Sequence, residues 1–110
     1  MQQHVYVDHF SFTLSNNLRV IAEPVTFAGL TDAAFNQIRQ YSTSDVAVTI
    51  RLLEAIACIA TFTHNPKQRE ALRRHANMIL QGSCEAISCK QDSKDVEYQY
   101  NIAVQTLTQN

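Results

Sequence analysis

The first part of the chain alternates apolar and polar residues, which is the pattern of a half-buried β-strand. The alternating apolar positions are Val5 and Val7, then Phe10, Phe12 and Leu14, and finally Leu18 and Val20. Between the last two runs lie Ser15, Asn16 and Asn17, and asparagine tolerates the positive φ of a tight hairpin turn. The alternation changes phase near Asp8, where the first strand either ends or contains a β-bulge. We therefore predict a β-hairpin in residues 1–23.

The rest of the chain has apolar residues at spacings of three and four, the pattern of amphipathic helices. The predicted helices run from Thr26 to about Tyr41, from Ser44 to Thr63, from Pro66 onward, and from about Lys94 to Leu107. In the first, third and last helices the side chains expected to be buried are Phe27, Leu30, Ala34, Ile38 and Tyr41, then Leu72, Ala76, Ile79 and Leu80, and then Val96, Tyr100, Ala103 and Leu107. Gly82 leaves one kinked third helix and two shorter helices as open alternatives. A polar turn around residues 91–93 is expected before the last helix.

The second of these helices, from Ser44 to Thr63, is apolar nearly all round and is expected to form the core. Ser44 can cap its first turn, and Asn65 followed by Pro66 ends the run and begins the next helix. Its less apolar residues recur at spacings of three and four on one face, and they are Arg51, Glu54, Cys58 and Thr61.

Length and composition agree with a folded domain. The 110 residues suffice for one domain with a single core, and 45% of them are hydrophobic against 17% charged. The predicted fold is mainly α, a bundle-like arrangement of four to five helices with an N-terminal β-hairpin. We expect one domain over residues 1–110, with the hairpin in residues 1–23 and the helical core in residues 26–108.

Charge and cysteine content bear on the compartment. The net charge of −1 provides no global field to attract nucleic acid or anionic lipid. Three cysteines are an odd number, which favours a reducing compartment, the cytoplasm, over a disulfide framework. The start of the chain lacks the pattern of a signal peptide. Arg51 and Glu54, in the middle of the most apolar helix, would each cost about 3 kcal/mol in lipid, so we do not expect this helix to span a membrane.

Residues 27–60 and 65–80 resemble a known family. Its pattern is a D-x-A-F-x-Q-I-R-Q-Y segment, a V-x-x-R-L-L-E-A helix and an arginine-rich helix. The matching residues here are Asp32, Ala34, Phe35, Gln37, Ile38, Arg39, Gln40 and Tyr41, followed by Val48, Arg51, Leu52, Leu53 and Glu54. Over roughly residues 20–80 the chain thus resembles the C-terminal soluble region of a bacterial family of predicted membrane proteins, domain of unknown function 2254.

The resemblance implies that relatives carry transmembrane helices ahead of this region and that the region lies outside the lipid. This sequence lacks those helices, so it is expected to be either a fragment or a free-standing relative. In either case a membrane association would come from a transmembrane region or a membrane partner outside this sequence. The resemblance implies no activity.

One group of charged residues is a candidate site. Arg51 and Glu54 lie three residues apart on one helical face and can pair directly. Asp32 and Arg39 lie on the preceding helix, and the guanidinium of Arg39 suits a carboxylate or phosphate. The group, with Tyr41 beside it, is interpreted either as a structural network or as a site for an anion or small molecule.

The sequence shows no clear site for nucleic-acid binding or for a metal or cofactor. The third helix carries Lys67, Arg69, Arg73 and Arg74, but these residues do not share one tight face and Glu70 lies among them. We therefore expect a solvated surface rather than a nucleic-acid site. The spacing of Cys84 and Cys89 and the scattered histidines predict no metal site, and we expect no cofactor.

The leading functional hypothesis is an interaction or oligomerisation module without catalytic activity, with the hairpin as a candidate contact between two copies. The alternative is a regulatory domain that binds an anion or small molecule through Arg39, Arg51 and Glu54. We expect a homodimer, no enzymatic activity and no nucleic-acid partner.

Overall fold

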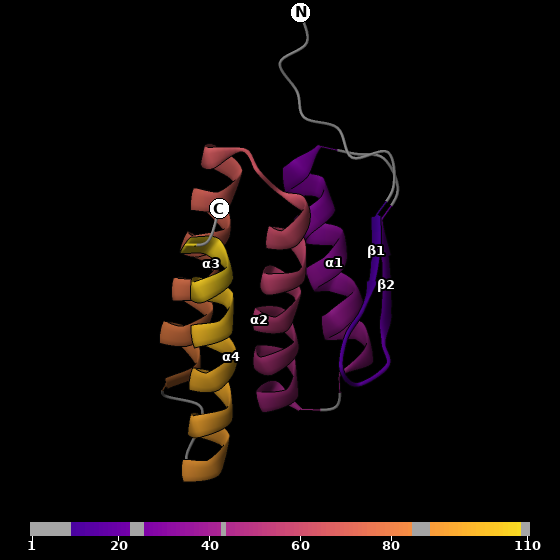
Figure 1. Ribbon diagram of the computed structural model, residues 1–110. Helices are drawn as coiled ribbons and strands as arrows, with labels where there is room; N and C mark the ends of the chain where they lie inside the picture. The colour runs from indigo at the N-terminus through magenta and orange to yellow at the C-terminus, as the bar shows by residue number, and fades with distance from the viewer. Residues whose placement is uncertain (1–9, 23–25, 43, 85–88, 109–110) are drawn as a thin grey trace, which may run out of the picture. The chain divides into compact units, whose positions relative to one another are not determined.

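A computed structural model describes residues 10–22, 26–42, 44–84 and 89–108 of the chain (Figure 1). The elements are β1 (Phe10–Thr13), β2 (Arg19–Ala22), α1 (Phe27–Tyr41), α2 (Asp45–Phe62), α3 (Pro66–Cys84) and α4 (Lys90–Thr108). They form two compact units, Met1–Tyr41 and Ser42–Asn110. The prediction of a mainly α fold with an N-terminal β-hairpin is confirmed. The prediction of a single domain stays a prediction.

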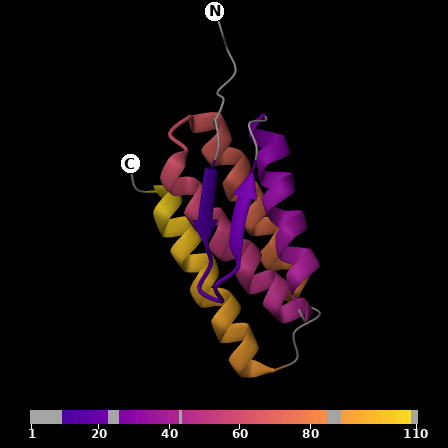
Figure 2. The same cartoon turned by 90° about the vertical axis from the view of Figure 1, so that its right-hand side faces the viewer.

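The hairpin of the first unit pairs β1 with β2 antiparallel (Figure 2). The register places Phe12 opposite Val20. Its turn depends on asparagine, as predicted. Asn17 adopts a positive φ of 70°, and the Leu18 amide donates to Asn16 Oδ1 at 3.2 Å. Leu14 and Val20 are buried, so the hairpin has one buried face. Val5, Val7 and the phase change near Asp8 lie outside the described residues.

Helix α1 begins and ends where the sequence predicts. Thr26 caps it, because its hydroxyl accepts from the Gly29 amide at 3.2 Å. Of the five predicted inward residues, Leu30, Ala34 and Ile38 are buried and Phe27 is half-buried.

The prediction for Tyr41 was wrong, because its side chain is 64% exposed. Tyr41 is the last residue of α1, so no further helical turn follows that would extend the buried face past it. Phe35 is buried instead, together with Thr31. These two residues lie four apart and form a second row beside the predicted stripe, so the buried face of α1 is wider than the sequence pattern indicates.

Helix α2 is the core element of the second unit, as predicted. The hydroxyl of its N-cap residue, Ser44, accepts from the Ala47 amide at 3.1 Å, and the helix ends at Phe62. Its buried residues occur on several sides of the helix and are Leu52, Leu53, Ala55, Ile56, Ile59 and Ala60. A helix with so much apolar surface needs more than one neighbour to cover it.

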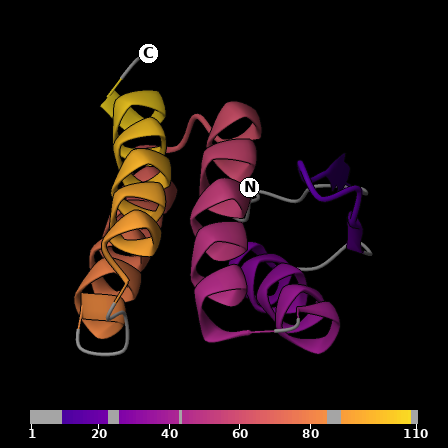
Figure 3. The same cartoon turned by 90° about the horizontal axis from the view of Figure 1, so that it is seen from below.

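Two neighbours in this unit, α3 and α4, pack against α2 and against each other (Figure 3). Leu72 and Ala76 of α3 and Val96, Ala103 and Leu107 of α4 are buried as predicted, whereas Ile79, Leu80 and Tyr100 are half-buried. The half-buried Tyr100 donates its hydroxyl to Asn77 Oδ1 at 2.6 Å and thereby links α4 to α3.

Helix α3 does not end at Gly82, and its course beyond Cys84, on which the alternatives of one kinked helix and two helices depend, lies outside the described residues. Helix α3 continues through Gly82 to Cys84, since one glycine in an exposed helical position costs only about 1 kcal/mol. The polar turn predicted at residues 91–93 is wrong, because α4 already begins at Lys90. Gln91 there donates to Asp95 at 3.0 Å, an i,i+4 pair that stabilises the first turns.

Arg69 of α3 ties together the ends of two other helices. Its Nη1 donates to the carbonyl oxygens of Ala60 and Thr63 at 3.1 and 2.6 Å, and its Nη2 donates to that of Thr106 at 2.8 Å. These carbonyls lie at the C-terminal ends of α2 and α4, which carry partial negative charge, and the Ala60 carbonyl also accepts from the Thr63 amide at 3.3 Å. Arg69 therefore has a structural role.

Replacing Arg69 with methionine should lower the free energy of unfolding by about 2–4 kcal/mol, because hydrogen bonds to several helix-terminal carbonyls are lost together. Chemical denaturation measures this change. The matched control is Arg74→Met on the same helix, since Arg74 is exposed and its one polar contact among the described residues is a loose 3.8 Å ion pair with Glu70. That control should change stability by less than about 0.5 kcal/mol. Equal losses in the two variants would contradict the structural role of Arg69.

Candidate functional site

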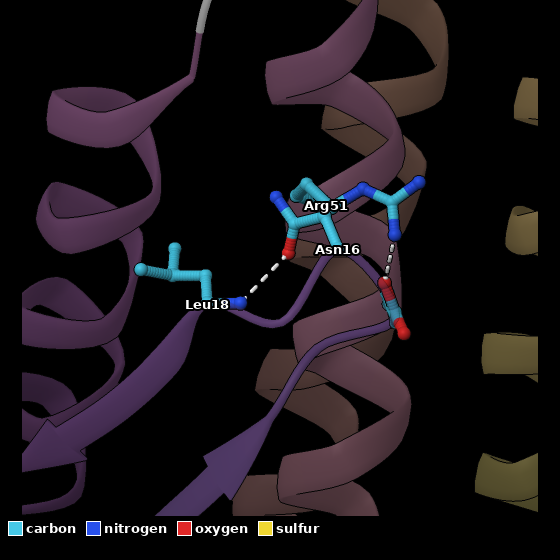
Figure 4. Close-up of polar contacts among 4 residues, drawn as sticks. Asn16, Leu18 and Arg51 are labelled. Carbon is cyan, nitrogen blue, oxygen red and sulfur yellow. Dashed lines mark hydrogen bonds and ion pairs between the residues drawn. The ribbon is translucent and has the colours of Figure 1, made fainter.

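Arg51 and Glu54 of the candidate site form a direct ion pair on α2. Arg51 Nη1 lies 2.5 Å from Glu54 Oε1, and each side chain is 18% exposed. The dashed line at Arg51 in Figure 4 marks this ion pair. The spacing of three residues places both groups on one face of the helix, as the sequence predicts. The guanidinium of Arg51 thus already has an internal counter-ion.

The other three residues of the candidate site, Asp32, Arg39 and Tyr41, are exposed on α1. Asp32 and Arg39 lie seven residues apart, which places them two turns apart on the same side of the helix. Arg39 makes no hydrogen bond or ion pair with the part of the chain that the structure describes. These three residues belong to the first compact unit and the Arg51–Glu54 pair to the second. That all five form one site stays a prediction.

Gln37 of α1 has a role that the sequence interpretation missed. Its side-chain amide accepts from the backbone N–H of Ile21 at 3.2 Å and donates to the Ile21 carbonyl at 2.7 Å. A primary amide can satisfy both groups of one strand residue, as a neighbouring strand would. Gln37 thus occupies the outer edge of β2. The feature of the sequence that could have indicated this role is that Gln37 is a polar residue between the inward-facing Ala34 and Ile38 of α1.

The outward face of the hairpin is also held by side-chain contacts. Arg19 Nη2 donates to Ser11 Oγ at 3.2 Å, which joins β2 to β1 on this face. Thr13, opposite Arg19, is exposed, and Ile21 is 44% exposed. The hairpin therefore presents a mixed polar and apolar surface above its buried face.

Cys58 lies on the same face of α2 as the ion pair, as predicted, and it is a half-buried free thiol. Burial raises the pKa of this thiol, and the negative charge of Glu54 raises it further. The thiolate is the nucleophilic form of cysteine, so both effects suppress the reactivity of Cys58 near neutral pH. This environment favours a packing role for Cys58 over the role of a nucleophile.

The basic residues of α3 do not converge on one site. Pro66, Lys67, Glu70 and Arg74 line an open depression of 410 Å³. Glu70 lies within it as a counter-charge, and the first amides of α3 are already bonded to Asn65 Oδ1 at 2.9 and 3.1 Å. Arg69 points to the helix ends described above. Within the described ranges, no group of three or more potential ligands could hold a metal ion.

The structure thus defines a mainly α protein with a β-hairpin, and the comparison with protein families agrees with the resemblance seen in the sequence. Residues 5–58 match the model of the family described as predicted membrane protein (DUF2254). The match includes the hairpin, α1 and most of α2, whereas the arginine-rich residues 65–80 lie beyond it. No curated protein and no solved structure matches the chain. None of the described helices combines the length and hydropathy needed to cross a bilayer.

Replacing Gln37 with alanine should destabilise the protein by about 1–2 kcal/mol, because two hydrogen bonds to Ile21 are lost. The Ile21 amide should then exchange its hydrogen faster, which NMR-detected exchange measures. Gln40→Ala, at an exposed position of the same helix, serves as the control and should leave the exchange at Ile21 unchanged. Equal exchange rates at Ile21 in the wild type and Gln37→Ala would refute the edge contact.

Cys58 should react with iodoacetamide several-fold more slowly than the exposed Cys89 at neutral pH, as read by peptide-resolved mass spectrometry. Because the Cys58 pKa is raised, its protonated thiol persists to higher pH. The difference in reaction rate between Cys58 and Cys89 should therefore narrow as the pH rises above 9. Glu54→Gln should accelerate the reaction of Cys58 without abolishing the effect of burial. A faster reaction at Cys58 than at Cys89 near pH 7 would contradict this description.

Proposed function

We propose that this chain is an interaction module of a membrane-associated protein and that its hairpin joins two copies of the module. The observation that supports this proposal most directly is the sheet of the described residues, which has two strands, so that both are edge strands. An edge strand presents backbone N–H and C=O groups that can pair with another chain. The hairpin lies within the residues that match the family, so its contact would be a property of the family region.

The proposed location is the cytoplasmic side of a membrane. The odd number of cysteines supports it, since Cys58 and Cys89 are free thiols in the structure. The proposed attachment is through transmembrane helices or a membrane partner outside this sequence. Joining two copies would then link two membrane-associated proteins.

The alternative function, binding of an anion or small molecule by Arg39, Arg51 and Glu54, has less support. The guanidinium of Arg51 already donates to Glu54, so a ligand would have to compete with this pair. Arg39 is exposed, but a single arginine on a helix surface does not define a ligand site. We therefore prefer the interaction module.

Light scattering after size exclusion, over a concentration series, tests the proposal. We expect a mass that rises from 12.4 kDa toward twice that value with increasing concentration. The association should be weak, because a contact made by one strand edge is small. At about 1 mM, even a free energy of association near −4 kcal/mol gives a detectable fraction of dimer. The proposal is therefore refuted if the measured mass stays at that of the monomer up to this concentration.

A further inference from the structure

The two edges of the hairpin differ in whether they are already occupied. Gln37 bonds both backbone groups of Ile21 on β2, so these groups point away from β1. In an antiparallel pair the residues alternate between pointing their backbone groups toward the partner strand and away from it. Leu14 donates to the Leu18 carbonyl at 2.9 Å, which fixes the same alternation at the turn end. The outer edge of β2 is therefore closed at its centre.

The same alternation identifies the outward groups of β1. Ser11 lies opposite Ile21 and Thr13 lies opposite Arg19, so both turn their backbone N–H and C=O groups to the outer edge. No hydrogen bond from the described residues reaches these backbone groups. The outer edge of β1 thus presents two donors and two acceptors in one row.

The side chains of β1 do not protect this edge. Natural edge strands commonly carry a lysine, another inward-pointing charge, a proline or a bulge that blocks pairing. The sequence of β1 is Phe-Ser-Phe-Thr, which contains no charge and no proline, and its register with β2 has no bulge. Two β1 strands can therefore approach each other without repulsion between like charges.

Resting on the proposed function, we infer that the partner is a second copy of this chain, which pairs antiparallel with β1 about a two-fold axis at Phe12. In this register Ser11 of each copy lies opposite Thr13 of the other, and four backbone hydrogen bonds form. Phe12 lies opposite Phe12 of the second copy at the closely spaced, non-hydrogen-bonded position, where aromatic pairs stabilise a sheet. The same patch serves both copies, as a two-fold interface requires. The product is a continuous four-stranded sheet.

Thr13→Pro tests this inference in the full chain. Proline is tolerated on an edge strand when its missing N–H would point outward, but it removes one donor per copy from the interface. The dissociation constant of the dimer, measured by analytical ultracentrifugation, should rise about ten-fold or more, because two hydrogen bonds are lost per dimer. Thr13→Val is the matched control, since it keeps the N–H and the β-branched shape. Its dissociation constant should stay within about two-fold of the wild-type value.

A second measurement uses the wild-type chain, so it does not depend on whether Thr13→Pro folds. It follows hydrogen exchange at the Ser11 and Thr13 amides at increasing protein concentration. We expect protection of both amides to rise with the fraction of dimer. Protection that is independent of concentration would overturn the inference, because it would assign the edge to another segment of the same chain. A dimer whose Ser11 and Thr13 amides stay unprotected would overturn the assignment to β1 while the proposed function survives. A monomer at all concentrations would refute both.

Discussion

Backbone N–H and C=O groups at the ends of helices and the edges of strands need hydrogen-bond partners, and this need organises both compact units. At the helix starts the partners are local, namely the side chains of Thr26, Ser44 and Asn65. At the helix ends the partner is distant, because Arg69 reaches carbonyls of α2 and α4. Gln37 provides hydrogen-bond partners for the backbone groups at the outer edge of β2, whereas no described residue provides them at the outer edge of β1.

The local partners are also the part of the structure that the sequence predicts well. The start of α2 follows from a serine before an apolar run, and the start of α3 from an asparagine followed by a proline. Asn17 in the hairpin turn follows from the tolerance of asparagine for positive φ. Each of these depends on a few neighbouring residues, so the pattern of the sequence contains the needed information. The extent of α4 was misjudged, because polar residues in a first helical turn resemble a loop.

The distant partners could not be predicted, because they depend on tertiary packing. Arg69 binds a carbonyl 37 residues away, and Gln37 binds a strand residue 16 residues away. From spacing alone Arg69 is indistinguishable from exposed neighbours such as Arg74. Within the candidate site, the Arg51–Glu54 pair was predictable because it is local, whereas the relation of Arg39 to that pair is not. The functional proposal accordingly rests on the hairpin, whose register the structure describes directly.

The central claim is that β1 of one copy pairs with β1 of another. The most direct measurement is a filtered nuclear Overhauser experiment on a mixture of isotope-labelled and unlabelled chains, which reports only contacts between copies. The account predicts a contact between the Hα atoms of Phe12 in the two copies, since the Cα atoms of such a pair lie about 4.5 Å apart. If Phe12 Hα shows no contact between copies at concentrations where the dimer is populated, the account is wrong.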